Sequence, residues 1–598
     1  MADAAPNPTR ADTTAIDRRE GKRFRFTPFS IFSGLLALAL VLLAMVPLIA
    51  VLLRAFIQDG KLDFAAIADT LAIPDLGETL LTTLWITLAS GAVSLVIGAI
   101  LAWLNERTDA RMGILTDALP LIAFVLPPIA GAVGWVLLLS PGAGYLNVLI
   151  RDLVGIFGVR MTDGPFDIYS WYGLIFVYSI YQVPFSFMFV SAALRNMDSS
   201  LEEASRVAGH GLATTLRRIT LPALAPSLAG AALLTVWTSL GLYSIPSVIA
   251  TGAGMKVLTV EIVNSVAFTY PARTDIAVGL SFLMIAAVAI VWFIQNQVVR
   301  RSRHAMVGGK SRAATPIRLG RWRIVARIFV FGYAFVTTAL PFLALALVTL
   351  TGFWTPNIDW ASFSLEPFRR QVLENPVSQE ALANSLTLGV VGATIAMLAA
   401  AVLSLFLLRM PTRWARSIDG AIKLPSTLSH IVLAVGFILI LAGPPFRLSG
   451  TWLILLLAYI ALYYPQGAVA ADGAAAQVAP ELAEASAVAG ASQSTTFRRI
   501  FLPLMVPGLI AGWALLFVRM VGDLSASAIL AGSGNPVVGR QILEVFQNGT
   551  FSLMASLAMT LTVISATVVI ALQIVSRRAA RWSTQPLSKS DLKGASVR

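Results

Sequence analysis

Long apolar stretches separated by short polar segments dominate this sequence. Twelve of them reach the length of about 20 mostly apolar residues that a membrane-spanning helix requires. Their approximate limits are Phe29–Leu53, Leu80–Leu104, Gly113–Ser140, Gly173–Leu194, Leu221–Ala250, Ile276–Val299, Phe329–Leu350, Ala383–Leu408, Ile418–Ala442, Trp452–Ala470, Leu502–Leu530 and Phe551–Val575. The pattern predicts an all-α polytopic membrane protein with about twelve transmembrane helices.

The composition supports this prediction and excludes several other classes of protein. Of the 598 residues, 57% are hydrophobic and 13% are charged, whereas soluble domains carry roughly 25% charged residues. The chain has no cysteine and three histidines, so disulfides, thiolate metal sites and a His-built metal cage are not expected. We assign no catalytic residue and no metal ligand.

Lysine and arginine are distributed unevenly between the apolar stretches. With the N-terminus in the cytoplasm, about three quarters of them lie on the cytoplasmic side, which is the bias that the positive-inside rule describes. The basic runs that this orientation places inside are Arg18 to Arg25, Arg217 with Arg218, Arg300 to Arg323, and Arg577 to Arg581. We therefore expect both termini in the cytoplasm, and we interpret the net charge of +13 as topology anchoring at the bilayer and not as nucleic-acid binding.

The chain divides into two halves of six predicted spans each. Residues 1–28 form a cytoplasmic tail, 29–299 the first half, 328–576 the second half and 577–598 a second cytoplasmic tail. Residues 300–327 contain Gly, Ser, Pro and charge but no apolar run, and are interpreted as a basic cytoplasmic linker.

One segment occurs twice. EEASRVAGHGLATTLRRITLPALAPSLAG begins at Glu202 and AEASAVAGASQSTTFRRIFLPLMVPGLIAG begins at Ala483, with an offset of 281 positions and no internal gap. Because each half has an even number of spans, both copies enter the membrane in the same direction, as in parallel repeats related by an axis along the membrane normal. Each copy follows the fourth span of its half, in a loop predicted to be cytoplasmic.

The chemistry of the repeated segment is that of a short exposed helix. Residues from Glu203 to Ala208 favour helix, and Gly209 is suited to a left-handed helix end. One interpretation is an amphipathic helix on the bilayer surface, but two matched copies facing one compartment favour a paired docking surface. The arginines that begin the next spans, expected to anchor at headgroups, are Arg217, Arg218, Arg498 and Arg499.

These residues resemble the EAA motif of ATP-binding-cassette importer permeases. The matching positions are Glu-Ala-Ser at 203–205 and 484–486, the glycines at 209 and 490, and Leu-Pro at 221–222 and 502–503. The resemblance implies coupling helices that fit two copies of a cytosolic ATPase subunit, and the residues that would make this contact are Glu203, Ala204, Gly209, Glu484, Ala485 and Gly490.

The resemblance also implies a location, partners and a substrate class. Fused pairs of this size are similar to ferric-iron importer permeases of the bacterial inner membrane, with thiamine, aminoethylphosphonate and polyamine relatives nearby. The family implies an extracytoplasmic substrate-binding protein, with ATP and magnesium bound by the partner ATPase and no cofactor on this chain. GDLSASAIL from Gly522 is similar to a pattern in the iron-type branch, whereas GLYSIPSVI from Gly241 lacks the acidic residue.

No energy source is predicted within the chain itself. GGKS at Gly308–Ser311 has His304 near the place where a phosphate-binding loop needs its first glycine, and no strand precedes it. We therefore predict a transport subunit that is not an enzyme, with ATP hydrolysis on separate chains.

Ionisable residues inside spans are costly, of order 3 kcal/mol on insertion scales, and point to function by default. Arg519 and Asp523 lie four residues apart in the eleventh stretch, a spacing that allows an ion pair. Two interpretations stay open: a structural ion pair, or an element of a gate or cation pathway, with Tyr243 and Ser525 as further pathway candidates.

The alternative function is a gradient-driven secondary transporter built from two parallel six-span halves. It accounts for the span count but not for the two matched loops. A membrane-bound enzyme is a third interpretation, which lacks a nucleophile, a metal cluster or paired acids within the spans.

Overall fold

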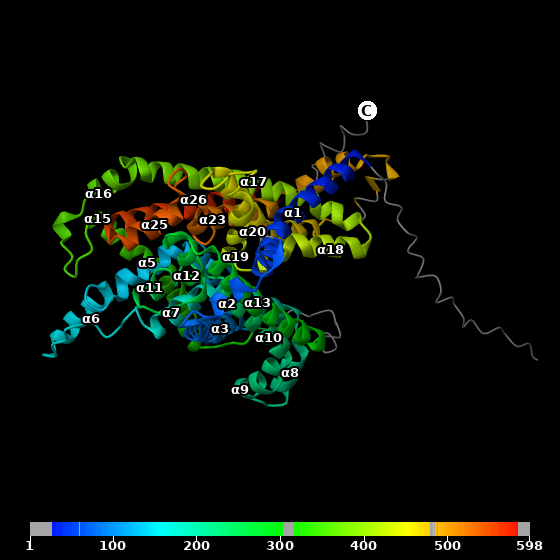
Figure 1. Cartoon of the computed structure of the whole chain (residues 1–598). Coiled ribbons are helices and arrows are strands. Elements are labelled where there is room, and N and C mark those ends of the chain that lie inside the picture. Colours follow the sequence, from blue (N-terminus) through cyan, green and yellow to red (C-terminus); the bar gives the residue numbers. More distant parts are fainter. Residues whose placement is uncertain are drawn as a thin grey trace, which may run out of the picture.

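The structure, a computed structural model, describes residues 27–58, 60–302, 316–478, 482, 485–486 and 488–583. Nearly all of these residues lie in helices, as the apolar pattern predicts (Figure 1). In the described part of the chain, the strands are β1 (Ile57–Gln58) and β2 (Lys61–Leu62), which pair antiparallel directly after the first long helix.

Ten helices are long and apolar enough to cross a membrane, and they coincide with ten of the twelve predicted stretches. In three of them a π-helical segment, labelled η, joins two α-helical parts. They are α1 (Pro28–Phe56), α3 (Leu76–Arg107), α7 (Trp171–Asn196), α9 (Leu212–Thr215) with η2 (Leu216–Thr220) and α10 (Leu221–Leu240), α13 (Thr274–Ser302), α14 (Trp322–Ala334) with η4 (Phe335–Ala339) and α15 (Leu340–Thr351), α17 (Pro376–Arg409), α20 (Trp452–Ala475), α22 (Gln493–Thr496) with η8 (Phe497–Phe501) and α23 (Leu502–Val521), and α26 (Phe551–Ser583).

The third and ninth predicted stretches are not single helices, which corrects the prediction of twelve continuous spans. In the third, α4 (Ile114–Ala118) and η1 (Leu119–Phe124) precede α5 (Pro128–Leu139). In the ninth, α18 (Thr412–Lys423) and η7 (Leu424–Thr427) precede α19 (His430–Leu441), and the two parts meet at a bend of 100°. Prolines at 127, 128 and 425 lie in these breaks, and proline interrupts a helix because it lacks the N–H donor and its ring clashes with the preceding turn.

The remaining helices are short and lie between the long ones. They are α2 (Ala65–Leu71), α6 (Tyr145–Gly155), α8 (Ser200–Val207), α11 (Ile249–Gly252), α12 (Leu258–Val263), η3 (Asn264–Phe268), η5 (Trp360–Ser362), α16 (Glu366–Phe368), η6 (Arg369–Leu373), α24 (Ser527–Leu530) and α25 (Val538–Gln547).

The two halves repeat one arrangement of helices. α5 and α19 have twelve residues each and begin 302 positions apart, and α10 and α23 have twenty residues each and begin 281 positions apart. A bond at the start of a short helix also recurs: the Leu258 N–H donates to the Thr83 hydroxyl at 3.0 Å, and the Val538 N–H donates to the Ser385 hydroxyl at 2.9 Å. The predicted all-α polytopic fold is confirmed.

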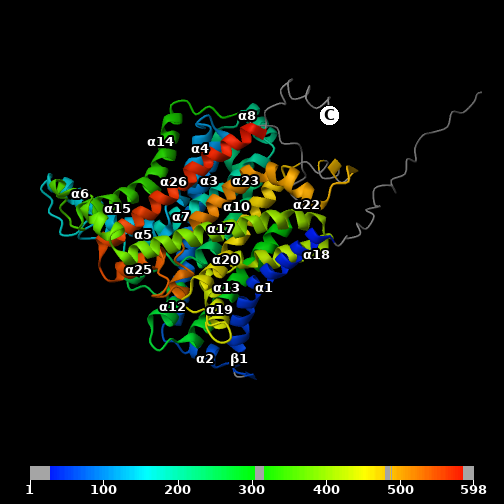
Figure 2. The same ribbon diagram turned by 90° about the horizontal axis from the view of Figure 1, so that it is seen from above.

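The first helix of each half packs on the other half. α1 lies beside α18 and α19, and α15 lies beside α5 (Figures 1 and 2). The described residues therefore form one bundle in which each half closes over its neighbour, with a large apolar core and a smaller apolar cluster among α3, α7, α10 and α14.

Candidate functional site

The first repeated loop leaves the bundle at the end of α7 and returns at η2. It contains α8, Gly209 and α9. In the second copy, Ala485, Ser486 and the residues from Val488 onward are described, whereas Glu484 lies outside the described residues. In the first copy Glu203 is partly buried and Ala204 is exposed, and in the second copy Ala485 is exposed.

A pair of hydroxyl groups closes each loop in the same way. The Ser205 and Thr215 hydroxyls lie 2.8 Å apart, and so do those of Ser486 and Thr496, 281 positions later. All four residues are buried. Each bond joins the loop helix to the segment that starts the next span.

Each loop helix ends at a glycine in the left-handed region. Gly209 has φ of 81° and Gly490 has φ of 75°, as the sequence predicts for Gly209. A Cβ added at either position would meet nothing within 4 Å. The backbone angle, and not crowding, therefore requires glycine, since residues with a Cβ adopt this conformation at a cost of about 1–2 kcal/mol.

Each loop exposes apolar side chains at matched positions. Val207 and Val488 are matched by the repeat, and both are 90% exposed. Arg217, Arg218, Arg498 and Arg499 are also exposed and lie in η2 and η8, at the start of the next spans. The two loops therefore expose apolar and basic side chains at matched positions.

Prolines shape the entry of these spans. Pro222 and Pro503 are the second residues of α10 and α23, directly after the π-helical turns η2 and η8. The wider π turn accommodates a ring that would clash with the carbonyl four residues earlier in a regular α-helix.

A buried ion pair ties the first loop to the bundle, and the sequence did not reveal it. Arg107, at the end of α3, contacts the Glu202 carboxylate at 2.9 Å, and both side chains are buried. The Thr220 hydroxyl donates to the same carboxylate at 2.6 Å. Arg107 was part of a short polar loop in sequence, and only the fold places it under α8.

The second loop is anchored differently. The positions that match Glu202 and Thr220 carry Ala483 and Phe501, so the acid and the hydroxyl are absent from the sequence there. Instead, the Thr27 hydroxyl donates to the Gln493 side chain at 3.1 Å, and the Phe29 and Phe497 rings lie 5.8 Å apart. The start of α1, from the other half, thus holds the second loop.

Within the bundle, Asp523 is the centre of a buried polar cluster. It follows α23, which ends at Val521, so Asp523 lies beyond the helix and not on its face. Its carboxylate accepts bonds from the Tyr463 hydroxyl at 2.6 Å and from the N–H groups of Ala526 and Ser527 at 3.0 and 3.1 Å. The His430 Nδ1 lies 4.0 Å from the carboxylate.

The ion pair that the four-residue spacing allows between Arg519 and Asp523 does not form in the structure, and a place for either residue in a pathway stays a prediction. Both residues lie in the described part of the chain, and no ion pair joins them; the Arg519 guanidinium lies 4.9 Å from the centre of the Phe124 ring. The helix ends between the two residues, which removes the four-residue geometry on which the prediction depended. Tyr243 and Ser525 are buried in the segments that follow α10 and α23.

The first half holds a neutral network at the corresponding place. Gln182, which matches Tyr463, donates to the Ser239 hydroxyl at 2.8 Å and accepts from the Thr238 hydroxyl at 2.8 Å. Thr238 matches Arg519, and Leu242 matches Asp523. The two corresponding places are therefore chemically different, with Arg519, Asp523 and His430 in the second half and a neutral network in the first.

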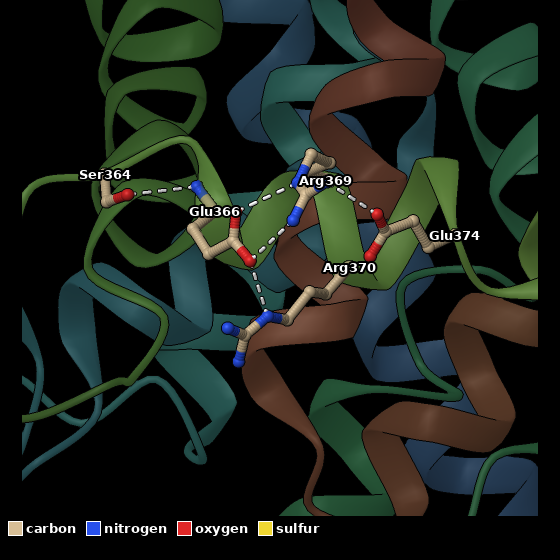
Figure 3. Close-up of polar contacts among 5 residues, drawn as sticks. All are labelled: Ser364, Glu366, Arg369, Arg370 and Glu374. Carbon is tan, nitrogen blue, oxygen red and sulfur yellow. Dashed lines mark hydrogen bonds and ion pairs between the residues drawn. The ribbon is translucent and has the colours of Figure 1, made fainter.

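A charged cluster orders the segment between α15 and α17 (Figure 3). The Glu366 carboxylate accepts from Arg369 at 2.9 and 3.0 Å and from Arg370 at 2.7 Å, and Arg369 also contacts Glu374 at 2.8 Å. The Ser364 hydroxyl caps the Glu366 N–H at 3.0 Å. The two guanidinium groups lower the pKa of Glu366 to about 2.

Among the described residues, no group of three or more His, Asp or Glu is placed to hold a metal ion. The fold thus has three notable features: two matched loops at one end of the bundle, polar groups in its interior that differ between the halves, and an ordered charged segment between α15 and α17. This arrangement is suited to moving a molecule across the membrane and to contact with protein partners.

Comparison with known families agrees with this arrangement. The family described as "Binding-protein-dependent transport system inner membrane component" matches residues 94–304 and 392–581. These segments are more than half of the chain, and the chain belongs to this family. Two matches in one chain make it a fused permease subunit of an ABC importer, and it resembles the permeases of ferric-type importers.

Several curated proteins are similar along most of the chain. A "Probable ABC transporter permease protein y4fN" of Sinorhizobium fredii is 27% identical over 84% of this chain and 88% of its own length. The "Ferric transport system permease protein FbpB" of Actinobacillus pleuropneumoniae is 22% identical over 80% of this chain and 68% of its own. The "Spermidine/putrescine transport system permease protein PotC" of Haemophilus influenzae is 25% identical over 37% of this chain and 85% of its own.

Among solved structures, a bacterial alginate ABC transporter in complex with alginate pentasaccharide-bound periplasmic protein gives a TM-score of 0.35 and 16% identity. The match covers 43% of this chain and 97% of that chain.

Proposed function

We propose that this chain is the membrane channel of an ATP-driven importer in which two copies of a separate cytosolic ATPase dock on the two repeated loops. The observation that carries the proposal is the equivalence of the loops: the same hydroxyl bond at 2.8 Å, the same left-handed glycine and the same exposed valine, at 281-residue spacing. Two equivalent surfaces in one chain fit two copies of one partner.

These contacts suggest how ATP binding by the partner is coupled to a rearrangement of the bundle. ATP, with magnesium, binds the partner subunits and draws them together, and the loops follow them. The Ser205–Thr215 and Ser486–Thr496 bonds then pass the movement to α10 and α23. The nucleotide shifts the population between two arrangements of the bundle only to the extent that it binds one arrangement more tightly.

The orientation of the chain is part of the proposal. Both termini and both loops lie in the cytoplasm of a bacterium, and an extracytoplasmic binding protein delivers the substrate to the opposite face. The lysine and arginine distribution supports this orientation, and so does the family's dependence on a binding protein.

We propose ferric iron as the first substrate to test. Two relatives described as ferric transport permeases align with 80% and 74% of this chain, and therefore with both halves. Relatives described as spermidine/putrescine or molybdenum permeases align with 37% and 44% of it. The fused arrangement favours iron over polyamine or molybdenum, and thiamine and aminoethylphosphonate stay as alternatives.

The first experiment is gentle purification of the tagged chain from membranes, followed by native mass measurement and an ATPase assay. We expect two copies of an ATPase subunit for each chain. If no ATPase copurifies under several mild conditions, and the chain alone catalyses gradient-driven uptake in proteoliposomes, a secondary transporter replaces the importer.

The coupling step is tested with the double variant Gly209→Val, Gly490→Val in the reconstituted complex. We expect uptake to be lost while insertion and ATP hydrolysis remain, because the strained backbone displaces both loop helices. Gly420→Val is the matched control, since Gly420 lies on the exposed side of α18 and a Cβ there meets nothing within 4 Å. Normal uptake by the double variant would count against the proposal.

Substrate choice is then measured as uptake of radioactive ferric iron in competition with spermidine and molybdate.

A further inference from the structure

The first half carries an arm that the second half lacks. Residues 140–170 connect α5 to α7, whereas residues 442–451 connect α19 to α20, so the connection is 21 residues longer in the first half. The offset between the halves changes from 302 to 281 at this point. The arm contains α6 and projects away from the bundle in both views (Figures 1 and 2).

The base of the arm is rigidly held. The Asn147 side-chain amide donates to the carbonyls of Leu139, Ser140 and Phe166 at 3.1, 2.9 and 2.7 Å, and its oxygen accepts from the Phe166 N–H at 3.1 Å. Gly164 packs so closely on Asn147 that a Cβ at position 164 would overlap the Asn147 side chain. The arm therefore has a fixed direction relative to α5 and α7.

The outer part of α6 and the turn after it carry a strip of large apolar side chains. The rest of the described bundle does not bury this strip. Leu149, Leu153, Ile156 and Phe157 are 55%, 51%, 77% and 85% exposed. Leu149 and Leu153 lie four residues apart on one side of α6, and Ile156 and Phe157 follow in the turn that ends the helix. A strip of large apolar side chains of this kind marks an interaction surface.

The position of the arm identifies what covers the strip. α6 follows the end of α5 and precedes α7, at the end of α7 opposite to the repeated loop. The first residues of α7, Trp171 and Tyr172, are 39% and 59% exposed, and exposed Trp and Tyr at the end of a span are typical of the membrane interface. α6 and these two aromatic residues therefore lie at the same end of α7, the end where a membrane interface is expected.

We propose that α6 is an interfacial anchor whose strip, Leu149 to Phe157, inserts into the lipid leaflet opposite to the repeated loops. An amphipathic helix in this position lies in the interface plane with its apolar side among the acyl chains. The arm fixes α5, and with it the break between η1 and α5, relative to the bilayer surface. This inference depends on the helices spanning a membrane and not on the identity of the ATPase or of the substrate.

The absence of cysteine from the sequence allows a direct test by single labelled cysteines. Phe157→Cys, labelled with bimane, is compared in proteoliposomes with Gly155→Cys on the other side of α6, where a Cβ meets nothing within 4 Å. We expect a blue-shifted emission for position 157, several-fold stronger quenching by nitroxide-labelled lipid than at position 155, and several-fold weaker quenching by aqueous iodide.

Two outcomes overturn the proposal. Equal quenching by iodide at positions 155 and 157 shows that the strip lies in water. Protection of position 157 that appears only when a purified binding protein is added shows that the strip is a protein-docking surface. The variant Leu153→Ser, Phe157→Ser should unfold in detergent at the wild-type temperature, because the strip is not part of the core, and its bimane signal at Ile156→Cys should lose the blue shift.

Discussion

Gly134 in α5 and Pro341 in α15 pack in direct contact, and a Cβ on Gly134 would lie 2.6 Å from the Cβ of Pro341. The same contact recurs with the halves exchanged, since a Cβ on Gly436 in α19 would lie 2.9 Å from the Cβ of Pro47 in α1. The first helix of each half thus places a proline against a glycine of the other half. These two contacts join the halves at the middle of α5 and of α19.

Alanine at Gly134 or Gly436 should therefore destabilise the chain. An overpacked core typically costs about 1–3 kcal/mol, and neither proline has a flexible side chain that can move aside. Thermal unfolding in detergent, followed by tryptophan fluorescence, measures the effect. Gly332→Ala in α14 is the control, because a Cβ there meets nothing within 4 Å and alanine favours helix by about 1 kcal/mol over glycine. Equal stability of all three variants would contradict the contact.

Removal of either member of the Arg107–Glu202 pair should be severe. A buried charge left without its partner costs about 3–5 kcal/mol, so Arg107→Ala and Glu202→Ala should each lower the unfolding temperature strongly. The double variant should be less destabilised than the sum of the two, because no charge is then left alone. Arg370→Ala, at an exposed ion pair, should change little. Additive losses from Arg107 and Glu202 would show that the pair is not coupled.

Substitutions at Asp523 separate a structural role from a role in transport. Tyr463→Phe removes one hydrogen bond to a charged group and should cost about 1.5–3 kcal/mol. Asp523→Ala should cost more, since it leaves the Tyr463 hydroxyl and two N–H groups unpaired. Asp523→Asn keeps an acceptor for the start of α24, and we expect it to retain both stability and transport. Loss of transport with full stability in Asp523→Asn would place the carboxylate in the substrate pathway.

The Glu366 cluster should respond to acid at unusually low pH. Its pKa is lowered from the ordinary 4.5 to about 2 by Arg369 and Arg370, so the carboxylate favours the folded segment above pH 4.5, and this contribution is lost as the pH falls from 4.5 toward 2. The carboxyl ¹³C signal that disappears in Glu366→Gln should titrate in this lower range. The global unfolding temperature of Glu366→Gln should not change, because the cluster is exposed. Titration near 4.5 would show that the ion pairs do not persist in solution.

The exposed valines provide a test of docking that leaves the fold intact. Val207→Glu with Val488→Glu should keep the wild-type unfolding temperature, since both side chains are 90% exposed, but should reduce copurification of the proposed ATPase several-fold. Phe353→Glu is the control, because Phe353 is 75% exposed in the segment after α15, outside the spans and the repeated loops. Unchanged copurification in the double variant would place the docking surface elsewhere.

The apolar pattern by itself determined the class of fold, because about 20 apolar residues in a row have no stable place outside a bilayer or a large core. The repeat determined the position of the two loops. Gly209, six residues after Glu203, predicted the left-handed end of α8, because that conformation depends on the backbone of one residue. These properties are local, and the sequence carries them within one segment.

The tertiary structure decided the properties that join distant segments. Whether Asp523 pairs with Arg519 or with Tyr463 depends on where α23 ends and on how α20 packs beside it. The Arg107–Glu202 pair joins positions 95 residues apart, and the contact of Pro47 with Gly436 joins the two halves. Apolar periodicity cannot predict such contacts, because any apolar face of a membrane helix can face lipid as well as it faces another helix. Close packing and the pairing of buried polar groups therefore select which helix faces meet.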